Sequence, residues 1–176
     1  MSGSECKNYI ACICEGSAEE VILDILLDAD LLIFSRDSLL GGELIRTRGG
    51  EAFARKHLGF ELDEKVTILR ILDSRSESFR IPLAYAWKIE DVYQVITSPE
   101  IEMLMILNEG LYKEYCKSGI KPSDFCKQKL HMSEVKTKAF VRDYFSDPDD
   151  LKNAIMEYKR VKKLPKGELC LADLLR

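Results

Sequence analysis

Apolar and polar positions follow one another along the chain with two spacings, one typical of short buried strands and one typical of amphipathic helices. Compact apolar runs, each bounded by polar or glycine-containing segments, predict strands at residues 9–14, 31–34, 66–72 and 92–96. Apolar residues that recur three or four positions apart predict helices at residues 17–28, 51–58 and 100–116. Strands that alternate with helices indicate an α/β fold, and we expect a mostly parallel sheet of about four strands flanked by helices.

The pattern changes after Gly119, where the strand-like runs end and only helical spacing remains. This spacing predicts three more helices, at residues 122–130, 134–145 and 149–160, followed by one terminal helical turn. We therefore divide the chain into an α/β domain of residues 1–118 and an all-helical C-terminal extension of residues 119–176. The extension is expected to pack on the α/β domain or on a partner.

Composition and charge narrow the classes of protein to consider. With 46% apolar and 32% charged residues, the 176-residue chain can bury a substantial core. A formal charge of −4 argues against a protein that coats nucleic acid by bulk charge, but it is compatible with a local basic patch. No apolar run approaches the roughly 18 residues of a membrane span, and the N-terminus lacks the build of a signal peptide. The six cysteines include no C-x-x-C pair, so we expect reduced, mostly buried thiols in a cytoplasmic protein without membrane contact.

Carboxylates follow three of the predicted strands at the point where each strand ends. Glu15 comes after IACIC, Asp73 after VTILRIL, and Glu100 and Glu102 after VYQVITSP. If the strands are parallel, these side chains gather at one edge of the sheet, where open α/β folds bind their ligands. Clustered carboxylates need a cation or a shared proton at neutral pH, and oxygen ligands suit Mg²⁺ or Mn²⁺. The alternative is that these residues merely cap helices and stay solvated.

Three segments together resemble a known family. The sequence EGSAE at residues 15–19 resembles the E-G-x-[ST]-E opening of TOPRIM domains, the topoisomerase–primase fold also found in overcoming-lysogenisation-defect nucleases. The segment SPEIEMLMILNEG at residues 98–110 resembles the S-N-P-x-F-E-x-W-x-L-L-H stretch of RloB-like and related abortive-infection proteins. Between them, ILDSR at residues 71–75 falls where those proteins carry an apolar strand ending in D-x-D. The resemblance covers about residues 8–116 and does not extend to the helical tail.

The resemblance implies a TOPRIM-like fold and a role for each matching residue. Glu15 matches the acidic residue proposed as general acid/base in TOPRIM catalysis, and Glu19 matches the second acid of the opening motif. Asp73 matches the first, metal-binding aspartate of D-x-D, and Glu102 matches the glutamate of the P-x-x-E segment. Arg75 stands in place of the second aspartate, and a guanidinium group cannot ligate a metal. Either Glu15, Asp73 and Glu102 hold the metal and carry catalysis, or this TOPRIM-like domain no longer cuts.

Arginines near flexible backbone are candidates for phosphate binding. Arg36, Arg46 and Arg48 lie in the glycine-containing segment FSRDSLLGGELIRTRGG, and Arg75 lies in the loop after the third predicted strand. Guanidinium groups in such segments suit bidentate contact with a phosphate. The alternative is that they pair with acids close in sequence, such as Asp37, Glu43 and Glu77.

These observations favour two functions from different classes. The first is a Mg²⁺-dependent (or Mn²⁺-dependent) TOPRIM-like nuclease or nucleic-acid-processing subunit of the kind found in phage-defence systems. It would bind DNA or RNA through a local basic cleft and could act with a partner ATPase or as a homo-oligomer. The alternative is a catalytically silent TOPRIM-like module that recognises a protein partner or a nucleic-acid end. A small-molecule enzyme ranks last, because the chain lacks both a G-x-x-x-x-G-K-[ST] loop and a G-x-G-x-x-G turn.

Overall fold

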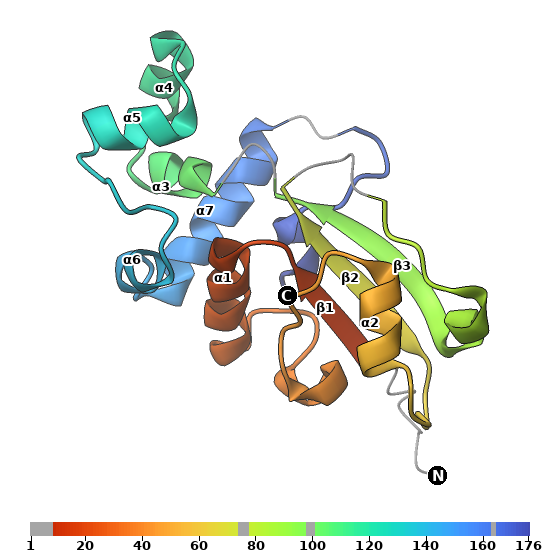
Figure 1. The fold of residues 1–176 in the computed structure, drawn as a ribbon. Coiled ribbons are helices and arrows are strands. Elements are labelled where there is room, and N and C mark those ends of the chain that lie inside the picture. Colours follow the sequence, from red (N-terminus) through yellow and green to blue (C-terminus); the bar gives the residue numbers. More distant parts are fainter. Residues whose placement is uncertain (1–8, 74–77, 98–100, 163–164) are drawn as a thin grey trace.

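The fold is built on a parallel β-sheet (Figure 1). The computed structural model describes residues 9–73, 78–97, 101–162 and 165–176. Within them the sheet has the strand order β1-β2-β3, and both pairs of neighbours are parallel. The strands are β1 (Tyr9–Cys14), β2 (Val66–Leu72) and β3 (Ile89–Ile96). The expected α/β class is confirmed, but the sheet of the described residues has three strands rather than about four.

The apolar run at residues 31–34 pairs with the end of the chain instead of joining the sheet. Leu32 forms an isolated antiparallel bridge with Leu175. The Ile33 amide donates a hydrogen bond to the Leu174 carbonyl oxygen at 2.9 Å. Ile33 itself is 59% exposed, so the run lacks the two buried faces of a strand inside a parallel sheet. The predicted fourth strand is therefore wrong.

Helices cover the two faces of the sheet through separate apolar clusters. Because strand side chains point alternately to opposite faces, neighbouring residues of β2 belong to different clusters. Leu69 packs in the cluster that contains α1 (Ser17–Asp28). Ile68 packs in the cluster that contains α2 (Gly50–His57), which lies in front of the sheet in Figure 1. The helices predicted at the first two positions are thus confirmed.

Helices that follow the sheet complete the layer on the α1 side, and their apolar residues belong to the α1 cluster. Contacts join α3 to α5 and α7, and α1 to α6 and α7. These helices are α3 (Glu102–Asn108), α4 (Tyr112–Ser118), α5 (Pro122–Lys129), α6 (Lys138–Tyr144) and α7 (Pro148–Val161). The single helix predicted at residues 100–116 is wrong, because Gly110 adopts a φ of 70° between α3 and α4. The three later helices are confirmed, although α6 begins four residues after the predicted start.

Short 3₁₀ segments lie between the main elements and after the last helix. They are η1 (Arg36–Ser38), η2 (Leu40–Gly42), η3 (Leu83–Lys88) and η4 (Leu171–Leu174). The described cysteines are free thiols, of which only Cys116 is exposed. No helix of the described residues has the length and apolarity needed to cross a membrane.

Candidate functional site

A pocket of about 190 Å³ lies beside the carboxyl ends of β1 and β2. One wall is the first turn of α1, and the others come from the end of β2, the start of α3 and the loop between α5 and α6. The residues that line it are Gly16, Ser17, Ala18, Glu19, Asp73, Ile101, Glu102 and Lys136. With three acidic side chains and one basic side chain, the pocket has an excess of negative charge.

The parallel pairing of β1 with β2 explains why residues far apart in sequence meet here. Cys14, the last residue of β1, pairs with Ile71 near the end of β2. The turn at Gly16 and the exposed Asp73 therefore leave neighbouring strands at the same edge of the sheet. The expected parallel arrangement is thus confirmed for these two strands, which are also neighbours in the sheet.

Glu102 is the most deeply buried charged group of the pocket, with an exposed fraction of 0%. Its Oε1 lies 3.2 Å from the Nζ of Lys136, whose side chain is 61% exposed. Burial and the charge of Glu102 together raise the pKa of Cys126, on α5, to about 12. A buried carboxylate is costly unless positive charge or hydrogen bonds compensate it. Lys136 therefore brings positive charge from the surface to a carboxylate that solvent does not reach.

Glu19 lines the pocket from the first turn of α1. Burial raises the pKa of its carboxyl above the usual range, and the charge of Asp73 raises it further. The Glu19 carboxylate folds back over Gly16. It lies so close that a Cβ atom at position 16 would collide with Glu19 Oε2. Gly16 thus lets this carboxylate occupy the pocket wall, and a cation in the pocket would relieve its repulsion from Asp73.

Of the residues proposed for catalysis, the pocket contains Asp73 and Glu102 but not Glu15. Glu15 directly precedes the pocket residue Gly16, and it is half-buried with its Oε1 atom shielded from solvent. Glu100 lies outside the described residues. The structure therefore brings together one acid of the opening motif, Glu19, with the acids that follow β2 and begin α3.

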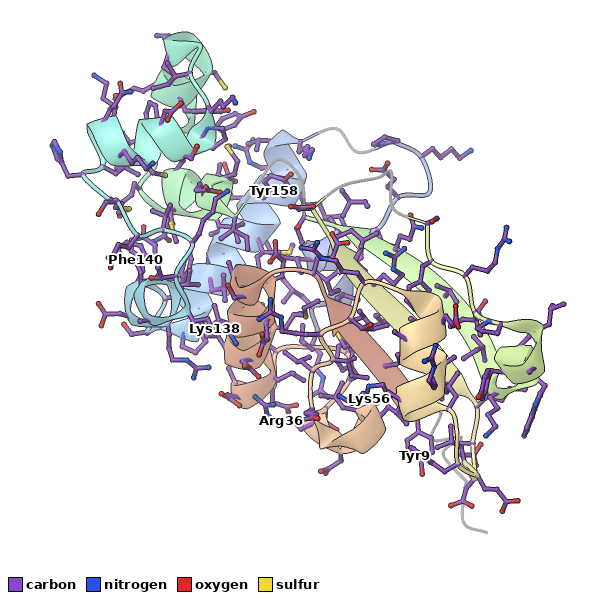
Figure 2. All side chains as sticks on the ribbon, in the orientation of Figure 1. Tyr9, Arg36, Lys56, Lys138, Phe140 and Tyr158 are labelled. Carbon is purple, nitrogen blue, oxygen red and sulfur yellow. The ribbon has the colours of Figure 1, made fainter. Side chains whose placement is uncertain are left out.

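Arg36 is held against α1 by two carboxylates. Its Nη2 lies 2.9 Å from Asp24 Oδ1 and 2.6 Å from Asp28 Oδ1. Arg142 of α6 approaches the same two residues at 3.8 and 3.9 Å. Figure 2 shows Arg36 beside the lower part of α1, away from the pocket end of the helix. This geometry corresponds to the ion-pairing alternative for Arg36, with partners on α1 rather than in its own segment.

Arg46 and Arg48, also proposed for phosphate binding, lie outside the pocket lining. Arg46 Nε is 3.8 Å from Glu20 Oε2, and the same carboxylate receives the Nζ of Lys138 at 2.7 Å through its Oε1. Figure 2 shows Lys138 between α6 and α1. Arg48 is exposed, and Arg75 lies outside the described residues.

Lys136 is the pocket residue that sequence reasoning missed. It lies 34 positions after Glu102, in a polar stretch between two predicted helices, and it belongs to no motif. A single lysine among many offers no pattern that could have identified it. Only the packing of α5 on α3, which carries the following loop past the pocket, brings it to Glu102.

The pocket offers the donor type that a hard divalent cation needs, namely carboxylate oxygens. Among the residues that the structure describes, no three His, Cys, Asp or Glu side chains come close enough together to hold a metal ion. The excess of negative charge in the pocket and the raised pKa of Glu19 are both compatible with a bound cation. The residues that would hold it are Asp73 and Glu102, and Glu19 lines the same pocket.

Comparisons of the chain with protein-family models, with curated proteins and with solved structures found no match.

Proposed function

We propose that this chain is a Mg²⁺- or Mn²⁺-dependent TOPRIM-like nuclease, or a nucleic-acid-processing subunit with that chemistry. The observation that carries the proposal is the pocket. Glu19, Asp73 and Glu102 come from three separate segments and line one cavity beside the carboxyl ends of parallel strands. In metal-dependent hydrolysis of a phosphodiester, carboxylate oxygens hold the cation that neutralises charge on the phosphate while water attacks.

Each residue has a distinct part in this proposal. When bound, a divalent cation supplies charge neutralisation and Lewis-acid activation of a phosphoryl group. Asp73 and Glu102 would hold it. Glu19, whose pKa is raised by burial and by Asp73, would hold or transfer a proton. Lys136 reaches the pocket from the surface and would place its ammonium group beside a phosphate oxygen.

A catalytically silent binding module is the second candidate, and one observation favours it. Lys136 already neutralises the most buried carboxylate of the pocket. In such a module the pair between Glu102 and Lys136 would be a fixed structural feature, and the pocket would have no need of a metal.

The test is cleavage by the purified chain of supercoiled DNA, linear duplex DNA and structured RNA, each with Mg²⁺, with Mn²⁺ or with a chelator. The proposal predicts metal-dependent cleavage of at least one substrate, and its loss in Asp73→Asn. The matched control is Asp37→Asn, which removes the same charge from an exposed residue outside the pocket and should cut like the wild type. A wild-type chain that cuts none of these substrates, with either metal, would contradict the proposal and favour the silent module.

A further inference from the structure

Positive charge is concentrated in one stretch of an otherwise acidic chain. Residues 112–138 hold seven lysines against three acidic residues, a formal charge of +4. Since the whole chain carries −4, the remaining residues carry −8. The stretch comprises α4, α5 and the loop that delivers Lys136 to the pocket.

Five of these lysines lie on α4, on α5 or in the turn between them, where they outnumber the exposed acids Glu114 and Asp124. The five lysines are all exposed, and none of them forms an ion pair with any residue that the structure describes. They are Lys113, Lys117, Lys121, Lys127 and Lys129. We call them the α4–α5 lysine surface. Lys113 and Lys117 are four positions apart on α4 and therefore share one side of that helix.

The helices that carry this surface are fixed next to the pocket. The rings of Tyr115 and Phe125 meet edge to face with centroids 5.5 Å apart, which locks α4 onto α5. The Sγ of Cys126 lies 3.8 Å from the carbonyl oxygen of Glu102, so α5 packs directly on the start of α3. Figure 1 shows α4 and α5 projecting from the end of the molecule that lies farthest from α2. The helices that carry the lysines are therefore held in place through a contact with Glu102, which lines the pocket.

The chemistry of the surface points to a phosphate backbone. The large apolar side chains that the described chain exposes lie outside residues 109–145, so the surface lacks anchors for insertion into a membrane. Its aromatic rings are turned inward: Phe125 is buried, and Tyr112 and Tyr115 are half-buried in the core. Without exposed rings it offers no stacking platform for the bases of a single strand.

We infer that the α4–α5 lysine surface binds the phosphate backbone of a double-stranded nucleic acid, independently of its sequence, and holds it beside the pocket. This inference rests on the proposed function for its link to the pocket. The binding step itself needs no metal, because lysines contact phosphates by charge alone.

The experiment is fluorescence anisotropy of a labelled duplex of about 20 base pairs, titrated with the full chain in EDTA at several salt concentrations. If all five lysines meet phosphates, the slope of log K against log salt concentration is about −4.5, since each contact contributes about −0.9. Lys113→Gln/Lys117→Gln should make this slope shallower by about 1.8. The matched control is Lys56→Gln/Lys166→Gln, which removes the same charge from two exposed lysines elsewhere and should leave the slope unchanged.

Four results would overturn the inference. They are no binding of duplex DNA or duplex RNA in EDTA, equal slope changes in the test and control variants, tighter binding of the single strand, and binding of anionic lipid vesicles instead of the duplex. Far-ultraviolet circular dichroism of each variant checks that a shallower slope does not result from unfolding.

Because no metal is present, a chain that binds duplex but does not cut would contradict the proposed function alone. A chain that cuts with an unchanged slope in Lys113→Gln/Lys117→Gln would contradict this inference alone.

Discussion

Replacing Lys136 by methionine keeps most of the length of the side chain but removes the positive charge beside Glu102. The two charges are 3.2 Å apart, and Coulomb's law at an effective dielectric constant of 20 gives about 5 kcal/mol for such a pair. The lysine side chain is 61% exposed, so water screens much of this energy. Glu102, by contrast, is fully buried and loses compensation that solvent cannot replace. We therefore expect Lys136→Met to lower the free energy of unfolding by about 1–2 kcal/mol.

The assay is urea unfolding of Lys136→Met, of Glu102→Gln and of the double variant. In the Glu102→Gln background the lysine no longer faces the buried carboxylate, so the second substitution should cost less than it does in the wild type. The double-mutant cycle should return a coupling energy of about 1–2 kcal/mol. Lys138→Met is the matched control, because Lys138 pairs with Glu20 outside the pocket at 2.7 Å and should cost at most about 1 kcal/mol.

Divalent cations add a second measurement to the same variants. If the pocket accepts a cation near Glu102, removal of the competing ammonium should increase the stabilisation by Mg²⁺ in Lys136→Met but not in Lys138→Met. A coupling energy near zero would refute the claim that Lys136 compensates the buried charge of Glu102. An unchanged response to Mg²⁺ would refute the idea that the lysine and a cation share this carboxylate.

Three further predictions follow from the described contacts. Glu19→Gln should raise the melting temperature at neutral pH without divalent cations, because burial and a neighbouring carboxylate disfavour its charge; a lower melting temperature would show that the charge stabilises the fold. Gly50→Ala should cost about 1–3 kcal/mol in thermal unfolding, since its Cβ would collide with the backbone of residue 80, whereas Gly49→Ala has open space and should be nearly neutral. Burial lowers the pKa of His57 below 6.5, so the unfolded state binds more protons and stability falls as the pH drops through 6.5. His57→Phe should flatten that dependence in unfolding experiments between about pH 7 and 5, and parallel curves for both proteins would contradict the assignment.

The sequence predicts the elements that their own residue pattern identifies. The β1–α1 unit and β2 follow directly from apolar runs and helical spacing. The run at residues 31–34 could not be assigned in this way. Its partners, Leu174 and Leu175, lie about 140 residues later, and an apolar run carries no information about which segment it meets.

The candidate site likewise contains residues that the sequence predicts and residues that it does not. Asp73 and Glu102 could be predicted, because parallel strands place the residues that follow them at one edge of the sheet. Lys136 could not, since only tertiary packing brings it to Glu102. The flexible surroundings of Arg36 favour a phosphate contact, but in the structure it pairs with Asp24 and Asp28, four residues apart on α1. Such a contact depends on how the segment folds back over the helix.

The most direct test of the central claim is thermal unfolding of the wild-type chain, of Asp73→Asn and of Asp37→Asn with and without Mg²⁺ or Mn²⁺. A ligand that binds only the native state at about ten times its dissociation constant stabilises it by about 1.4 kcal/mol, which raises the melting temperature of a chain of this size by about 3–6 °C. The account predicts such a rise in the wild type and in Asp37→Asn, and its loss in Asp73→Asn. No rise in the wild type, or an equal rise in Asp73→Asn, would contradict a cation site in this pocket.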